Sequence, residues 1–167
     1  MTDTTPDPQT LIAELERQEQ RLQFTTFTND DAWTLGCLIV GLARERSLPV
    51  TVDIRRHGQQ LFHAARPGTT PENDSWIERK CRVVDRFAEA SYLVGRRLSA
   101  KGRTLDEASG VEPIRYAAHG GSFPIRVRDV GVVGTVTVSG LPQADDHALV
   151  VESIERFLTA GGADAPR

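Results

Sequence analysis

The stretch PVTVDIRRHGQQLFHAA, residues 49–65, decides the fold class, because it contains two alternating segments joined by a tight turn. Apolar residues at 50, 52 and 54 alternate with polar ones, which is typical of a strand with one buried face. His57-Gly58 suits a two-residue hairpin turn, in which glycine supplies a positive φ. Such a turn pairs residue 56 with 59 and Val52 with His63, so His63 is predicted to lie on the apolar face.

A second hairpin is predicted further along the chain, with strands over 122–128 and 132–139 and a turn at 129–131. A short extended piece is expected at 23–27, and helical periodicity indicates helices between the strands. The expected N-terminal ends of these helices are Asp7, Asn29 as N-cap, Asn73 as N-cap, and Asp145 or Asp146 as N-cap. The third helix is predicted to continue unbroken to about Ala100. Since tight turns join antiparallel strands, the order predicts an α+β fold with helices packed on a mostly antiparallel sheet.

Bulk properties bound the class of protein. The 167 residues predict one domain over 1–167, with frayed ends at about 1–7 and 160–167. A net charge of −3 without a basic block gives no reason to expect a nucleic acid or an anionic membrane as partner. No apolar run approaches the roughly 20 residues that span a bilayer, and no secretory signal is recognised, so a cytoplasmic location is expected. Cys37 and Cys81 are predicted to be buried free thiols.

Two glycine-containing stretches resemble the signature of the haem-degrading-domain family. They read GGSFPI over 120–125 and GVVGTVTVSGLP over 131–142, and DDH follows at 145–147. The resemblance covers residues 29–158 and is closest to the branch of uncharacterised proteins related to the GlcG-like and HbpS-like members. It implies a profilin-like arrangement of sheet and helices, a homo-oligomer, and binding of haem or a related tetrapyrrole in some members.

Among the four histidines, His119 and His147 are the main candidates for an axial haem ligand. Met1 is the only methionine, so His, Tyr or Cys must supply such a ligand, and Tyr92 and Tyr116 are the tyrosine alternatives. His147 lies in the first turn of the last helix, where the helix dipole should keep its imidazole neutral. Alternatively, it is a hydrogen-bonded residue that anchors this helix to the preceding strand. His119 precedes two glycines, which would let a flat ligand approach the backbone, or which serve only a surface turn. The predicted cofactor-binding residues are His119, Gly120, Gly121, Phe123, Ser139 and His147, with His119 and His147 as metal ligands.

Catalytic patterns give no assignment, so whether the chain is an enzyme stays open. Ser139 lacks the outer glycine of a hydrolase elbow, and Asp145-Asp146 is explained by helix capping. The first functional hypothesis is an oligomeric protein that binds haem or another tetrapyrrole as its small-molecule ligand. The second is a non-enzymatic oligomeric adaptor or protein-interaction module, and the third is an enzyme on a small organic acid.

One structural feature would separate the first two hypotheses. A vacant apolar cleft near Gly121, Ser139 and His147 favours the first hypothesis, whereas filled packing there favours the second. Self-association is expected because the helix over 29–46 is apolar on most of its sides and because Leu149 lies off the apolar stripe of the last helix.

Overall fold

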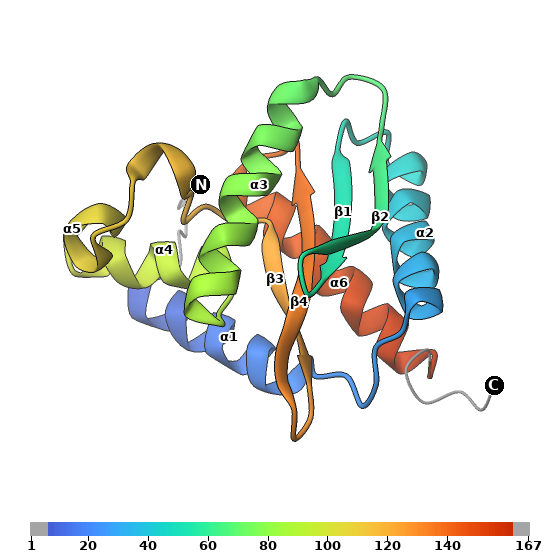
Figure 1. The fold of residues 1–167 in the computed structure, drawn as a ribbon, viewed down its shortest axis with the longest axis horizontal. Helices are drawn as coiled ribbons and strands as arrows, with labels where there is room; N and C mark the ends of the chain where they lie inside the picture. Colours follow the sequence, from blue (N-terminus) through green and yellow to red (C-terminus); the bar gives the residue numbers. More distant parts are fainter. Residues whose placement is uncertain (1–6, 162–167) are drawn as a thin grey trace, which may run out of the picture.

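The computed structural model describes residues 7–161 and shows helices on both sides of one sheet (Figure 1). The elements are α1 (Pro8–Arg21), α2 (Asn29–Glu45), β1 (Thr51–Arg56), β2 (Gln59–Ala65), α3 (Pro71–Phe87), α4 (Ser91–Ala100), α5 (Leu105–Ser109), a 3-10 turn (Pro113–Arg115), β3 (Ser122–Val127), β4 (Gly131–Ser139) and α6 (Gln143–Thr159). The four strands are antiparallel, in the order β2-β1-β4-β3. The predicted α+β architecture is confirmed. Most of the two predicted frayed ends, 1–6 and 162–167, lies outside the described residues.

The two faces of the sheet differ in chemistry. One face carries Val52, Ile54, Val136 and Val138, which are fully buried in the apolar core together with residues of α2 and α6. Because side chains alternate along a strand, the intervening residues point to the opposite face. That face is polar, and α3 crosses it (Figure 1). The core therefore lies on the α2 and α6 side, while α3 covers a polar layer.

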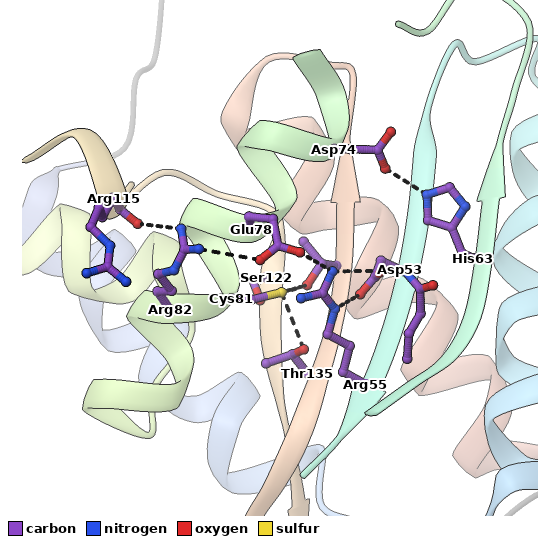
Figure 2. A network of polar contacts seen from close by, with 12 residues as sticks. Asp53, Arg55, His63, Asp74, Glu78, Cys81, Arg82, Arg115, Ser122 and Thr135 are labelled. Atoms are coloured by element: carbon purple, nitrogen blue, oxygen red, sulfur yellow. Dashed lines mark hydrogen bonds and ion pairs between the residues drawn. The ribbon is translucent and has the colours of Figure 1, made fainter. Parts of the chain in front are cut away.

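A buried polar network joins α3 to this face of the sheet (Figure 2). The Asp53 carboxylate is fully buried and accepts hydrogen bonds from Arg55 Nε at 2.7 Å and Gln60 Nε2 at 2.6 Å. Arg55 also donates to Glu78 of α3 at 2.6 Å. Nearby, the Cys81 thiol lies 3.5 Å from the Thr135 hydroxyl. Partners of this kind are what buried polar groups require, so α3 is positioned by hydrogen bonds as well as by apolar packing.

The starts of α2 and α3 each lie before the residue that the sequence suggested. Thr28 is the N-cap of α2, and its hydroxyl accepts from the Asp31 N–H while Asp31 accepts from the Thr28 N–H. Thr70 is the N-cap of α3, and Asn73 Oδ1 accepts from the Thr70 N–H at 2.9 Å. The predictions of Asn29 and Asn73 as caps are therefore wrong. In a capping box the second partner lies three residues after the cap, which explains the displacement to Asn73.

The start of α6 is also different from the prediction. Pro142 is its N-cap, and neither Asp145 nor Asp146 takes that position. The Asp146 carboxylate accepts from the Leu141 N–H at 3.0 Å, but its other oxygen faces Lys80 of α3. Asp146 therefore connects two helices instead of only closing the end of one.

The long helix predicted from Asn73 to about Ala100 is two helices. The first ends at Phe87, and Ala88 adopts a left-handed conformation with φ of 54°. The second begins after Ala90, whose N–H donates to the buried Glu19 carboxylate of α1 at 3.0 Å. A partner distant in the sequence thus satisfies a backbone donor at the break.

The first hairpin has the predicted turn and a different register. His57 and Gly58 have φ of 50° and 78°, and Arg56 pairs with Gln59 as predicted. An irregularity next to Ile54 then pairs Ile54 with Phe62 and Asp53 with His63. His63 is consequently exposed on the α3 side, where its Nε2 lies 2.7 Å from Asp74 Oδ1 (Figure 2), and its predicted inward position is wrong.

The packing of Phe62 accounts for this shift in register. Phe62 is buried against α2, where a Cβ added at Gly36 would overlap its ring. The irregularity therefore places the larger aromatic side chain in the core, which burial of apolar surface favours.

The second hairpin follows the prediction closely. The strands span Ser122–Val127 and Gly131–Ser139, with Asp129 at a φ of 61° in the turn. The extended piece expected at 23–27 is reduced to a single bridge between Phe24 and Val127. Within 7–161, no helix combines the length and apolar character needed to cross a membrane.

Candidate functional site

A polar hollow of about 290 Å³ lies at the end of β4, where α3 and the start of α6 converge. Its lining residues are Asn73, Trp76, Lys80, His119, Ser139, Gly140, Leu141, Gln143 and Asp146. We call it the Lys80 hollow. Two of the predicted site residues, His119 and Ser139, line it. The region is therefore neither the vacant apolar cleft nor the filled packing that the sequence hypotheses distinguished.

A buried ion pair forms part of the wall of the Lys80 hollow. Lys80 and Asp146 are 3% and 2% exposed, and Lys80 Nζ donates to Asp146 Oδ2 at 2.9 Å. Lys80 Nζ also donates to the Val138 carbonyl at 3.1 Å. Burial lowers the pKa of Lys80 and raises the pKa of Asp146, while the attraction between the two charges opposes both shifts. Removing two charges from water costs free energy, so buried ion pairs are uncommon. Ionisable residues with shifted pKa values that line a hollow are candidates for a functional site.

The space beside the Cα atoms of Gly120 and Gly121 is filled by other atoms of this protein. A Cβ at Gly120 would overlap the Gln143 carbonyl of α6. A Cβ at Gly121, which has a φ of 130°, would overlap the Val138 carbonyl and lie 2.6 Å from Lys80 Nζ. The two glycines therefore let α6 and Lys80 approach the strand closely, and no space for a ligand remains at their Cα atoms.

His119 lies at the edge of the Lys80 hollow with an exposed ring that meets Trp76 edge-on, at 5.4 Å between centroids. Desolvation lowers the pKa of His119, and the charges of Lys80, Arg79 and Arg96 lower it further. The imidazole is therefore neutral near pH 7, which is the form that coordinates metal ions.

A second hollow, of about 470 Å³, meets the first at His119 and Gln143. It is lined by Arg79, Gly95, Arg96, Leu98, Ser99, Arg103, Thr104, Leu105, Asp106, Pro113, Tyr116, Ala117, Ala118, His119 and Gln143. We call it the arginine hollow, after its three guanidinium groups. Sequence reasoning missed these arginines, because α3, α4 and the following loop contribute one each and they form no run.

None of the three arginines makes an ion pair with the described part of the chain. Arg79 donates to the Pro113 carbonyl, and Arg103 donates to a backbone carbonyl of α5. The Nε atoms of Arg79 and Arg96 are buried and have no hydrogen-bond partner among residues 7–161. Guanidinium groups with unused donors are suited to carboxylate or phosphate ligands.

His147 is buried in the core and lines neither hollow. It is 4% exposed, and its Nε2 lies 2.8 Å from Gln18 Oε1 of α1. Burial lowers its pKa to about 4, so the predicted neutral state is confirmed, with burial instead of the helix dipole as its cause. Its ring lies near Tyr92 and near Phe123, another predicted site residue, which is also buried. The geometry fits an anchor between α6 and α1 instead of the predicted tie to the preceding strand.

No group of three or more His, Cys, Asp or Glu residues within 7–161 could hold a metal ion. His119 therefore offers a single imidazole, and a metal there would have to bring its other ligands with it. A porphyrin iron meets that requirement, because the macrocycle supplies four nitrogen ligands.

The outer face of α2 is apolar and exposed. Trp33 is 65% exposed and meets Phe62 of the edge strand β2 edge-on, and Cys37 is exposed one turn further along, so its predicted burial is wrong. The predicted burial of Cys81 is confirmed. Beside this face, Leu38 and the end of α6 line a hollow of about 720 Å³. Leu149, which was expected to add to this surface, is buried within the chain at 3% exposure.

Comparison with protein families gives a match over most of the chain. The family model described as "Haem degrading protein HbpS-like" matches residues 27–155. A relative from Streptomyces coelicolor, described as a UPF0303 protein, is 66% identical over 147 residues, which are 88% of this chain and 93% of the relative. Another UPF0303 protein, from Edwardsiella ictaluri, is 52% identical over 147 residues, which are 88% of this chain and 94% of the relative.

Solved structures agree with this match. The Ybr137w protein is similar with a TM-score of 0.83 and 34% identity, over 89% of this chain and 88% of that one. A PduOC:heme complex is similar with a TM-score of 0.66 and 18% identity, over 78% of this chain and 94% of that one. HbpS has a TM-score of 0.62 at 20% identity, over 81% of this chain and 92% of that one. The last two likenesses show a shared fold.

Proposed function

Because the chain belongs to the HbpS-like family of haem-degrading proteins, we propose that it binds haem or a related tetrapyrrole in the arginine hollow. A neutral imidazole at His119 and three guanidinium groups that make no ion pair within residues 7–161 line this one hollow, and that observation carries the proposal. A protein of the same fold was solved as a haem complex, which supports the choice of ligand.

The residues of the hollow divide into two roles. His119 is the proposed axial ligand, since it is the histidine that lines the hollow. Arg79, Arg96 and Arg103 are proposed to bind the carboxylates of the tetrapyrrole through charge-assisted hydrogen bonds. Bound haem would supply a redox-active iron. His147 is not part of the proposed site, because it is enclosed in the core.

Haemin titration of the purified protein, followed by its optical spectrum, tests this proposal. The wild type should give a saturable Soret band, and His119→Ala should shift the band and weaken binding about tenfold, a loss of about 1.4 kcal/mol. Arg96→Gln should weaken binding of haemin while the band position stays, because a carboxylate contact does not touch the iron.

His63→Ala is the matched control, because His63 is an exposed histidine that lines neither hollow. It should bind haemin as the wild type does. If the wild type binds haemin no more tightly than an unrelated protein without a haem site, or if His119→Ala leaves the spectrum unchanged, the proposed site is wrong.

Self-association is the second part of the proposal, and the exposed Trp33 on α2 favours it. Burying such a surface against a second copy would stabilise an oligomer by roughly 25 cal/mol per Å². The alternative of a protein-interaction module uses the same face for a different protein, so the oligomeric state distinguishes these two uses of α2. Both cysteines are free thiols, which is usual in a reducing compartment, and the cytoplasm stays the proposed location.

A further inference from the structure

We propose that the Lys80 hollow is a second site, in which the Lys80 amine forms an imine with a small oxo acid, that is, an aldehyde or ketone that carries a carboxylate. This reaction goes beyond tetrapyrrole binding and uses a different hollow. Lys80 and Asp146 both line the space, together with two side-chain amides and the neutral imidazole of His119. An amine, a carboxylate and hydrogen-bond donors at one small hollow are the groups that imine formation requires.

The amine must lose a proton before it can attack a carbonyl carbon. Asp146 Oδ2 lies 2.9 Å from Lys80 Nζ, so the acceptor for this proton is already in hydrogen-bonding contact. Burial lowers the pKa of Lys80 and raises the pKa of Asp146, and both shifts favour the neutral pair. Desolvated lysines of this kind are the ones that form Schiff bases.

The step balances without an oxidant or reductant. Lys80 transfers one proton to Asp146, and the Nζ lone pair forms a bond to the carbonyl carbon as the C=O π electrons move to oxygen. One proton then moves from the positively charged nitrogen to that oxygen, which gives a neutral carbinolamine. Asp146 returns its proton as the C–O bond breaks, water leaves, and an iminium remains on Nζ. The net change converts one ammonium and one carbonyl group into one iminium and one water.

The surroundings favour a carbonyl compound with a negative charge. Lys80, Arg79 and Arg96 each act on His119 as positive charges, although the whole chain has a net charge of −3. The iminium keeps the positive charge of Lys80, so a carboxylate on the same molecule would be attracted before and after the reaction.

Two amides supply donors for that carboxylate. Gln143 Oε1 accepts from the Gly120 N–H at 3.2 Å, and Asn73 Oδ1 accepts from the Thr70 N–H. Both side chains line the hollow, and no hydrogen bond within residues 7–161 uses the donors of their NH₂ groups. The volume of about 290 Å³ is at the small end for ligand pockets, which selects a small molecule.

The alternative is that Lys80 only ties α3 to α6 and to the Val138 carbonyl. Reductive trapping separates the two roles, because a purely structural lysine does not form a covalent adduct. The chain has only two lysines, Lys80 and Lys101, and Lys101 is exposed at the end of α4. The exposed lysine is therefore an internal control for non-specific reaction.

The experiment incubates the full chain, without haemin, with pyruvate and sodium cyanoborohydride and locates the reduced adduct by peptide mass spectrometry. We expect the labelling of Lys80 to saturate and to be about ten times that of Lys101. This ratio corresponds to about 1.4 kcal/mol of binding free energy for pyruvate in the hollow. Hydroxyacetone, an uncharged ketone of similar size, should label Lys80 much less. Lys101→Arg should keep the Lys80 label, and Gln143→Ala should reduce the preference for pyruvate over hydroxyacetone.

If Lys101 is labelled more than Lys80, the proposal is overturned. Labelling of Lys80 that does not saturate with pyruvate would also overturn it. The comparison of the two lysines is made within the wild-type chain, so it does not depend on a variant that folds. Since haemin is absent, failure of the tetrapyrrole proposal leaves this outcome unchanged.

Discussion

Two buried ionisable residues set opposing pH responses in the core. His147 has its pKa lowered to about 4 by burial, and Glu19 has its pKa raised to about 7 by burial, which the hydrogen bond from the Ala90 N–H only partly offsets. The neutral form of each residue is the one that the core accommodates. Stability therefore falls with decreasing pH through His147 and with increasing pH through Glu19.

His147→Gln isolates the first of these effects. An unfolded histidine binds a proton below about pH 6.5, whereas His147 in the folded chain does so only below about 4. The contribution of His147 to the free energy of unfolding is therefore fully present above pH 6.5. Up to about 3 kcal/mol of this free energy is lost as the pH falls to 4. Urea unfolding between pH 7.5 and 4.5 should show the stability advantage of the wild type over His147→Gln shrinking. Glu19 is present in both proteins, so its contribution cancels.

A wild-type advantage over His147→Gln that is constant across this range would show that His147 is not held neutral by burial.

The sequence led to His119 and missed the ion pair beside it. His119 was found because it precedes two glycines, a local signal. Lys80 was missed because a lysine on a helix is normally solvated. It does follow Ile77 by three residues, and Ile77 begins the buried stripe that continues through Cys81 to Val84. That spacing was the available signal, but the position of Asp146 opposite Lys80 depends on the packing of α3 against α6, which the sequence does not encode locally.

At the scale of elements, the break between α3 and α4 stores local strain. Ala88 has a φ of 54°, a conformation in which an L side chain crowds the backbone, and its N–H donates to the Val84 carbonyl at 2.8 Å. Such a helix end is usually occupied by glycine. The surrounding contacts, including that of Ala90 with Glu19, hold the break in place despite the alanine.

Ala88→Gly should therefore stabilise the protein by about 1 kcal/mol, because relief of left-handed strain exceeds the added freedom of the unfolded chain. Thermal or urea unfolding measures the gain. Ala100→Gly, at the exposed end of α4, is the control and should destabilise slightly, since glycine is a poor helix former. Destabilisation by Ala88→Gly of the size seen for Ala100→Gly would contradict the left-handed assignment.

Turns were predicted well, and long-range irregularities were not. The turn at His57-Gly58 depends on two adjacent residues, so the local sequence was sufficient. The register beyond it depends on Phe62 packing against Gly36 of α2, and the helix break depends on Glu19 of α1. Both of these missed features are stabilised by a partner in a different element, which periodicity within one segment cannot reveal.

For the whole molecule, the arrangement of layers separates two surfaces. The hollows lie beyond the end of β4, where residues of α3, α4 and the start of α6 line them. The exposed apolar surface lies on α2, where Trp33 contacts Phe62 of the edge strand β2. Since these surfaces belong to different layers, a second copy could cover α2 without closing either hollow. Ligand binding and self-association are therefore testable independently.

Trp33→Glu should dissociate the proposed oligomer. A charge placed in an apolar interface would lose its hydration, and the aromatic contact area would be lost as well. Light scattering at micromolar concentration should give at least twice the chain mass of 18.4 kDa for the wild type and a mass near 18.4 kDa for Trp33→Glu. Ile114→Glu is the matched control, because Ile114 is 80% exposed in the 3-10 turn, away from α2, and this variant should stay oligomeric.

A monomeric wild type would refute self-association. An oligomer that survives Trp33→Glu and dissociates with Ile114→Glu would place the interface elsewhere. If both variants and the wild type are monomers that still bind haemin, the exposed tryptophan is left as the contact for a different protein, and a protein-interaction module becomes the better account of α2.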